Sequence, residues 1–184
     1  NGSALVTIYV NDGSITVPQQ ITLTVFAVND NQEATSAIRK VAIQRSAKLN
    51  LLGNQFAIKK VVGKDHYSES FIYKHKNGRI HDLKLSLIGD FQVDNAGLAI
   101  SACQQHAFNT GKELSDQTIR MGLKTSKWGG RIEVVTYNPT MILDCAHNPD
   151  AVKKMATCIK NKFSYANLIL IIGLMKDKPI ENIL

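Results

Sequence analysis

The chain has 184 residues, a formal net charge of +7 and a hydrophobic fraction of 44%. This length suits one ordinary domain or two small ones, and no apolar run approaches the roughly 18 residues of a membrane-spanning helix. The Lys and Arg residues are spread along the chain rather than clustered. The charge therefore argues against nucleic-acid binding and fits small ligands that carry phosphates or several carboxylates.

Cysteines, histidines and the first residues of the chain bear on location and metal chemistry. The three cysteines are odd in number and have no metal-ligand spacing, and the five histidines are scattered. No basic segment followed by an apolar stretch opens the chain, so no signal peptide is indicated. We therefore expect a cytoplasmic protein with reduced thiols, no membrane anchor and no metal site among these residues.

Residues 1–30 differ in composition from the rest, because they are rich in Val, Ile and Thr and contain no Lys or Arg. Two β-rich runs on either side of Asn11-Asp12-Gly13 predict a β-hairpin over residues 3–28. With the later Ala27-Val28-Asn29-Asp30, this segment resembles the end of a cadherin-like or bacterial immunoglobulin-like repeat. Asp residues at the ends of such repeats bind calcium, although solvated turn residues explain Asp12 and Asp30 more simply.

The segment from residue 31 to 127 alternates predicted helices and strands. Apolar spacing over residues 31–47 predicts an amphipathic helix with Ala34, Ile38, Val41 and Ala42 on one face. Short strands are expected at 47–53, 55–62 and 81–89, and a hairpin turn at 76–79. The last strand leads into a helix over 89–108, whose small side chains allow close packing on a sheet.

Residues 141–173 have the pattern of a βαβ unit. Buried strands are predicted at 141–146 and 167–173, with an amphipathic helix over 149–163 between them, which favours parallel pairing. Ligands of open α/β sheets bind beyond the carboxyl ends of such strands, where Asp144 and His147 lie. Asn148 and Pro149 suit the start of the helix, whose N-terminus favours an anion. Alternatively, Asp144 only satisfies nearby backbone amides.

Four motifs follow one another along the chain: GDFQVDNA (89–96), WGGRIE (128–133), DCAHNP (144–149) and GLMKDK (173–178). In this order and spacing, residues 31–184 resemble the folylpolyglutamate synthase/dihydrofolate synthase branch of the Mur ligase superfamily. The resemblance implies an α/β fold. Residues 31–127 would be the C-terminal part of a Mur ligase ATP-binding central domain. Residues 128–184 would be a truncated Rossmann-like C-terminal domain, and residues 1–30 a foreign-looking β-hairpin. Phe91 and Gly129 depart from the branch's usual residues, and Phe91 is assigned no chemistry.

Members of that branch join L-glutamate to a folate or dihydropteroate carboxylate through an acyl phosphate formed from ATP, with Mg²⁺. The resemblance implies that Asn95 and Arg131 contact the ATP and that Asp144 holds the nucleotide from the C-terminal domain. His147, the candidate catalytic residue, would lie by the transferred phosphate or the incoming glutamate. Gly130 would serve the hinge between the domains, and a monomer is usual in the branch. A fixed Arg suits this task because it grips phosphate oxygens in two places.

The P-loop of that branch, a glycine-rich turn ending in Gly-Lys-Ser/Thr, does not occur in the sequence, because Gly63-Lys64 precedes Asp65 and Gly111-Lys112 precedes Glu113. The magnesium ligands of the branch lie in the same N-terminal region. We therefore expect a fragment that cannot ligate alone, and that is marginally stable or self-associating with a broad thermal transition. The residues do not separate folylpolyglutamate from dihydrofolate synthase activity. Two other functions stay open: a surface adhesion module in residues 1–30, or a non-catalytic nucleotide-binding relic.

Overall fold

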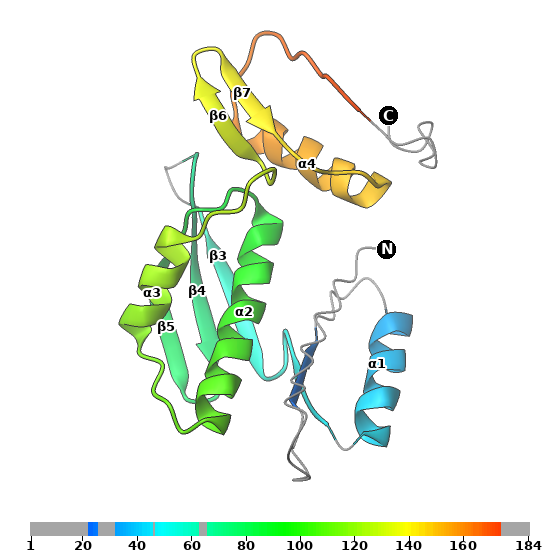
Figure 1. Ribbon diagram of the computed structural model, residues 1–184, viewed down its shortest axis with the longest axis vertical. Coiled ribbons are helices and arrows are strands. Elements are labelled where there is room, and N and C mark those ends of the chain that lie inside the picture. The colour runs from blue at the N-terminus through cyan, green and yellow to red at the C-terminus, as the bar shows by residue number, and fades with distance from the viewer. Residues whose placement is uncertain (1–21, 26–31, 46, 63–65, 174–184) are drawn as a thin grey trace, which may run out of the picture.

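The structure is a computed structural model that describes residues 22–25, 32–45, 47–62 and 66–173 (Figure 1). Most of the hairpin expected at 3–28, with Asp12 and Asp30, lies outside these ranges, as does nearly all of the motif at 173–178. The described residues form a mixed α/β protein with three small sheets and four helices. None of the helices in this part of the chain is long and apolar enough to cross a membrane.

The largest unit is an antiparallel sheet of strands β3 (Phe56–Val61), β4 (Glu69–His75) and β5 (Gly78–Leu85), in that order. Helices α2 (Asp90–Asn109) and α3 (Asp116–Thr125) pack on one face of it (Figure 1). Alternate residues of β4 enter the core, since successive side chains of a strand face opposite sides. This first cluster contains the following buried residues: Phe56, Phe71, Tyr73, Ile80, Leu83, Leu85, Val93, Ala96, Leu98, Ile100, Ile119 and Leu123.

The strands and the long helix predicted between residues 47 and 108 are confirmed, with small shifts of their ends. The hairpin turn predicted at 76–79 connects β4 to β5, which begins at Gly78. Close packing of α2 on the sheet depends on a small residue, because a Cβ at Gly97 would collide with the Ile58 side chain. The long helix therefore lies directly on β3.

A second, two-stranded sheet lies beside α2. Strand β1 (Thr22–Val25) pairs in parallel with β2 (Lys48–Leu51), and helix α1 (Gln32–Gln44) connects them. The predicted helix is confirmed, and Ala42 is buried, although Val41 is half-exposed. The described end of residues 1–30 thus belongs to a βαβ connection that crosses residue 30. Nothing in the described residues pairs β1 in the expected antiparallel hairpin.

The third unit contains strands β6 (Glu133–Tyr137) and β7 (Thr140–Leu143) and helix α4 (Pro149–Lys162). The strand and helix predicted near these positions are confirmed, but the predicted parallel βαβ unit is wrong. β7 pairs antiparallel with β6, and residues 167–173 form no strand. Met141 and Leu143 are more than half exposed, and Ile169 and Ile171 more than four-fifths, so these segments are not buried. Apolar β-prone sequence becomes a strand only where a neighbouring strand pairs with it, and 167–173 has no such partner among the described residues.

A short connection after α3 leads to this third unit, which lies beyond the N-terminal end of α2 (Figure 1). A small second cluster joins them: Ile88, Ile132 and Cys158 are buried, with Phe91 and Phe163 packed against them. Phe91 thus has a packing role, and a Cβ at Gly89 would come 2.7 Å from its ring. Below, the elements up to α3 are called the first part and residues 130–163 the second part.

Candidate functional site

Backbone hydrogen bonds hold residues 130–132 in a defined turn. The Gly130 amide donates to Glu133 Oε2 at 2.8 Å, and the Gly130 carbonyl accepts from the Cys145 amide at 2.8 Å. Gly130 has φ +69° and Ile132, which is 1% exposed, has φ +49°. Positive φ is costly for a β-branched residue, so the surroundings impose it. Arg131, exposed between these two residues, is therefore carried on a fixed backbone.

Asp144 is one of the groups that fix this turn. It follows β7, and its Oδ2 accepts from the Ile132 amide at 2.9 Å while Oδ1 accepts from the Ala146 amide at 2.8 Å. The alternative interpretation of Asp144, as an acceptor for nearby backbone amides, thus describes contacts that the structure contains. Its carboxylate ties the end of β7 to the residue after Arg131. A role in holding a nucleotide stays a prediction.

His147 lies in the turn before α4. Its Nδ1 is 3.1 Å from the Cys145 carbonyl oxygen, which can only accept, so Nδ1 carries the hydrogen of this bond. In the neutral ring, Nε2 is then an acceptor. Asn148 caps the helix as predicted, because its Oδ1 accepts from the Ala151 amide at 2.9 Å, and Pro149 is the first residue of α4. The remaining amides and the dipole at this helix start favour an anion.

The start of α2 carries a group of charged residues around Asn95. The Asn95 side chain is exposed and donates to Gln92 Oε1 at 3.0 Å. Beside it, Lys60 Nζ lies 3.5 Å from Asp94 Oδ2. Burial raises the pKa of the Asp94 carboxyl, and the positive charges of Lys60 and, more weakly, Lys154 oppose that shift. Since Lys154 belongs to α4, its influence on Asp94 indicates that α4 faces the start of α2.

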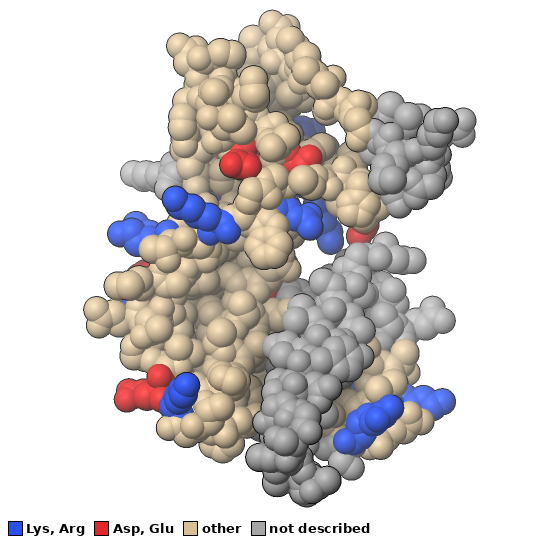
Figure 2. Space-filling view, in the orientation of Figure 1, with Lys and Arg blue, Asp and Glu red and all other residues tan. Residues whose placement is uncertain are grey.

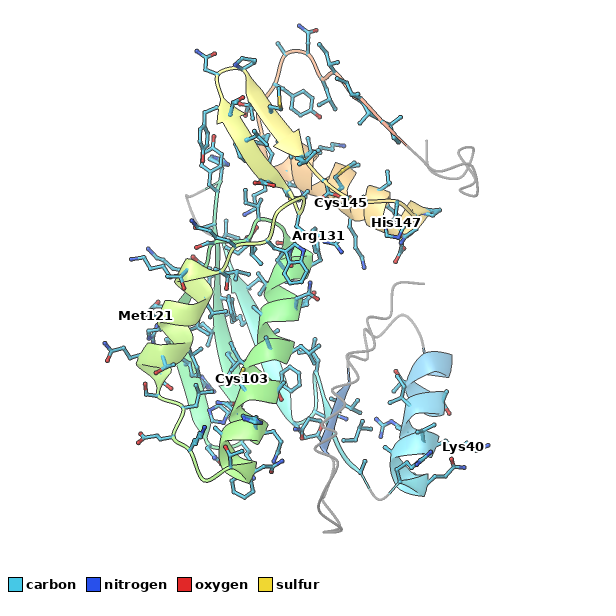
Figure 3. All side chains as sticks on the ribbon, viewed as in Figure 1. Lys40, Cys103, Met121, Arg131, Cys145 and His147 are labelled. Carbon is cyan, nitrogen blue, oxygen red and sulfur yellow. The ribbon has the colours of Figure 1, made fainter. Side chains whose placement is uncertain are left out.

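The predicted residues lie on the two parts that meet at the start of α2, and no hydrogen bond connects them in the described structure. Figure 3 shows Arg131, Cys145 and His147 on the side of the second part that faces α2. Figure 2 shows Lys and Arg side chains along this boundary, with acidic side chains beside them. Asn95 lies on the first part, whereas Arg131, Asp144 and His147 lie on the second. Such a boundary suits a phosphate-bearing ligand, because positive groups and a helix start face it.

Sequence reasoning missed two acidic residues that shape this boundary. Glu133 fixes the Gly130 amide, and Glu69 is 6% exposed and accepts from the Gly89 amide at the start of α2. Glu133 stands inside the motif at 128–133, three residues after Gly130, so the motif contained its signal. Glu69 had a weaker signal, as an acidic residue at the first position of an otherwise alternating strand.

The described residues also bear on a metal site. No group of three or more His, Cys, Asp or Glu residues able to hold a metal ion occurs in the parts of the chain that the structure describes.

Comparison with known proteins identifies relatives of this fold. The family described as "Mur ligase, glutamate ligase domain" matches residues 130–183. The folylpolyglutamate synthase of Lacticaseibacillus casei is 37% identical over 112 residues, which are 61% of this chain and 26% of that protein. The dihydrofolate synthase/folylpolyglutamate synthase of Bacillus subtilis (strain 168) is 34% identical over 116 residues, 63% of this chain and 27% of that protein.

A solved structure titled as a complex of folylpolyglutamate synthase with AMPPCP and folate has the same fold. It superimposes with a TM-score of 0.72 at 29% identity, over 79% of this chain and 35% of that one. The chain spans about a quarter of the length of the two curated relatives described above. These similarities agree with the resemblance inferred from the four motifs. The chain is a homologue of the folylpolyglutamate synthases and dihydrofolate synthases, and its last third matches the glutamate ligase domain of the Mur ligases.

Proposed function

We propose that the chain forms the nucleotide-facing part of an ATP-dependent ligase that adds L-glutamate to folate or dihydropteroate through an acyl phosphate. Residues 31–127 would belong to the ATP-binding central domain and residues 128–184 to the C-terminal domain. The observation that carries the proposal is the fixed turn at 130–132, which presents Arg131 beside the turn at 144–149. A related protein solved with AMPPCP and folate supports these ligand classes.

Each candidate residue has chemistry that suits this proposal. Arg131 would neutralise phosphate charge, and its fixed backbone would lower the cost of ordering the side chain on binding. Asn95 would contact the nucleotide from α2. Asp144 uses one acceptor site on each oxygen for a backbone amide, and a carboxylate has about four such sites, so it can still accept from the nucleotide. His147 would offer Nε2 toward the transferred phosphate or the incoming glutamate.

A nucleotide-binding experiment tests these roles. AMPPCP titrated onto the purified chain should slow amide hydrogen exchange in residues 130–132 and 144–148. Arg131→Met should weaken the affinity about tenfold or more, because a hydrogen bond to a charged group contributes about 1.5–3 kcal/mol. Lys127→Met removes a neighbouring exposed charge outside the turn. It is the matched control and should change the affinity for AMPPCP little. Absence of protection by AMPPCP in the unmodified chain would argue against the proposed site.

A second candidate function is nucleotide binding without ligation. The sequence favours it through one observation: no Gly-Lys-Ser/Thr loop is present to cradle the phosphates. Phosphoryl transfer depends mostly on positioning and charge neutralisation, which such a loop and its metal provide. We expect the 184-residue chain to bind nucleotide without glutamate-dependent ATP turnover. Measurable ATP turnover that depends on glutamate would exclude the non-catalytic function. It would also show that ligation does not require a Gly-Lys-Ser/Thr loop in the same chain.

A further inference from the structure

Glu69 is the charged residue that lies deepest among the described parts of the chain. Its side chain is 7% exposed, at the first position of β4. A carboxylate taken out of water is stable only when charges and hydrogen-bond donors replace the lost solvent. Each of its oxygens has such a donor: Oε1 accepts from the Gly89 amide and Oε2 from Lys162 Nζ, both at 2.8 Å.

The two donors belong to different parts of the molecule. Gly89 is the N-cap of α2 and has no side-chain cap of its own, so the carboxylate of Glu69 occupies the position where a helix favours negative charge. Lys162 is the last residue of α4, where a helix favours positive charge, and its side chain is 21% exposed. The ion pair thus connects the start of one helix to the end of the other.

Apolar and aromatic residues adjoin both ends of this ion pair in the chain. Phe163 follows Lys162 in the chain, and its ring centroid lies 6.1 Å from that of Tyr67. The ring centroid of Tyr67 in turn lies 5.2 Å from that of Tyr137. Next to Gly89, Ile88 packs in the second cluster with Cys158 of α4. Because the Glu69 side chain is only 7% exposed, the attraction between the two charges is stronger than at the surface.

The helices that the pair connects carry the candidate site. Asn95 lies in the second turn of α2, while Asp144 and His147 directly precede the first turn of α4. A rotation of the second part about the connection after α3 would separate Lys162 from Glu69 and leave a buried charge with one partner. The ion pair therefore opposes changes in the angle between the two helices.

We propose that the Glu69–Lys162 pair is an interlock that sets the angle between the two parts, with Glu69 as a positioning residue for the site at their boundary. Its consequence for nucleotide binding rests on the function proposed above, but the interlock itself does not. The pair orients Arg131 and the turn at 144–149 toward Asn95 without contacting any of them.

Distance measurements between spin labels test the interlock in the whole chain. Cys103 on α2 is exposed and provides one label site (Figure 3). Met141→Cys on β7, where Met141 is 55% exposed, provides the other, in a Cys145→Ser background. Cys158 is buried and should stay unlabelled. We expect one narrow distance distribution for this parent. Lys162→Met should broaden or shift that distribution, because it removes the charge and keeps most of the side-chain length.

Three further variants separate the interlock from a general loss of structure. Lys162→Arg keeps the charge and should restore the narrow distribution. Lys60→Met breaks the exposed ion pair with Asp94, which lies within the first part, and should leave the distance distribution unchanged. Glu69→Gln should act as Lys162→Met does; if it does not fold, the partly exposed Lys162 decides the question.

A parent distribution retained in Lys162→Met would overturn the proposal, since the apolar cluster alone would then set the angle. Broadening of equal size in Lys60→Met would overturn it as well. The measurement needs no nucleotide, so a chain that fails to bind AMPPCP still reports on the interlock. A failed interlock, in turn, leaves the nucleotide site to be judged by its own protection experiment.

Discussion

Gly130 determines whether the turn that carries Arg131 can form. Its φ of +69° belongs to the left-handed region, and a Cβ there would lie 2.5 Å from Cys145 Sγ. The conformation alone costs a non-glycine residue about 1–2 kcal/mol, and overpacking adds about 1–3 kcal/mol. We expect Gly130→Ala to lower the free energy of unfolding by about 2–5 kcal/mol, measured by urea denaturation.

Two variants separate the conformational cost from the steric cost. Gly111 has φ +64° with nothing within 4 Å of an added Cβ, so Gly111→Ala should cost only about 1–2 kcal/mol. The double variant Gly130→Ala/Cys145→Ala lacks the colliding sulfur. Its loss of unfolding free energy should therefore fall to about that of Gly111→Ala. Equal losses in Gly111→Ala and Gly130→Ala would mean that the contact with Cys145 has no energetic effect.

Burial of the Cys158 thiol has a consequence for the pH dependence of stability. Burial, with a smaller contribution from the Glu69 charge, raises its pKa from an ordinary 9.0 to about 11. Between these values the unfolded chain loses this proton while the folded chain keeps it. The contribution of Cys158 to stability is therefore complete below pH 9 and is lost as the pH rises toward 11.

Cys158→Ala should remove that part of the pH dependence. We expect unmodified chain and variant to differ in unfolding free energy by a constant amount below pH 9, and the difference to shrink between pH 9 and 11. Urea denaturation at several pH values measures this difference, in which the titration of Tyr and Lys residues cancels. A difference that does not change with pH would contradict the raised pKa.

Residues whose partners are close in sequence were the ones that the sequence could identify. Asn148 and Pro149 were placed correctly because a helix N-cap bonds to an amide three residues later. Asp144 accepts from one amide two residues away and from another, that of Ile132, twelve residues away. The amide partner of Glu69 is twenty residues away, so these two longer-range contacts depend on the tertiary fold. The motifs therefore pointed to the candidate residues, and the contacts that shape their surroundings needed the structure.

At the scale of elements, α3 is a helix that the sequence analysis did not predict. It is short, and the signal lay in its cap: Ser115 Oγ accepts from the Thr118 amide at 3.2 Å, and Ile119 and Leu123 then follow one turn apart on the buried face. A serine followed by apolar residues at this spacing is a recognised helix start. Strands β3 and β5 were predicted, whereas β4 was not, although its buried and exposed residues alternate.

The Ser115 cap should contribute measurably to stability. Ser115→Ala leaves the Thr118 amide without its acceptor and should lower the free energy of unfolding by about 1 kcal/mol. Ser115→Asp keeps an acceptor at the helix start and should retain most of the stabilisation that the cap contributes. Both are measured by thermal unfolding followed by circular dichroism. A loss as large in Ser115→Asp as in Ser115→Ala would show that the hydrogen bond is not the cause.

The segment at 167–173 illustrates the limit of prediction at this scale. Its apolar composition predicted a buried strand, but Ile169 and Ile171 are among its most exposed side chains. Whether such a run becomes a strand depends on a partner distant in sequence, which composition does not reveal. The antiparallel partner of β7 is instead β6, which precedes it after a short turn.

At the scale of the whole molecule, the two parts have cores of very different size. The first cluster contains large, fully buried side chains such as Phe71 and Tyr73, whereas the second is built around Ile88, Ile132 and Cys158. Because apolar burial is the main stabilising contribution, the second part should open at a lower free energy. A difference of this kind would broaden the thermal transition, which stays a prediction.

Native-state hydrogen exchange measures that difference directly. Amides of β6 and β7 should exchange through an opening of lower free energy than amides of β4. Low concentrations of urea should change the exchange rates of β4 amides more steeply than those of β6 and β7, because the opening that exposes β4 exposes more surface. Identical opening free energies and identical urea dependence in β4 and β7 would show that the two parts unfold as one unit.

The ion pair between Glu69 and Lys162 joins residues 93 positions apart in the chain. Closing so long a loop is entropically unfavourable, so we expect the contact to form after the local hairpins and helices and after the folding barrier. A contact made after the folding barrier stabilises by slowing unfolding. Stopped-flow kinetics should therefore show faster unfolding of Lys162→Met with an unchanged refolding rate, and slower refolding would place the contact earlier. With this order of events, the pair would govern how long the assembled arrangement persists and would have little influence on how fast it is reached.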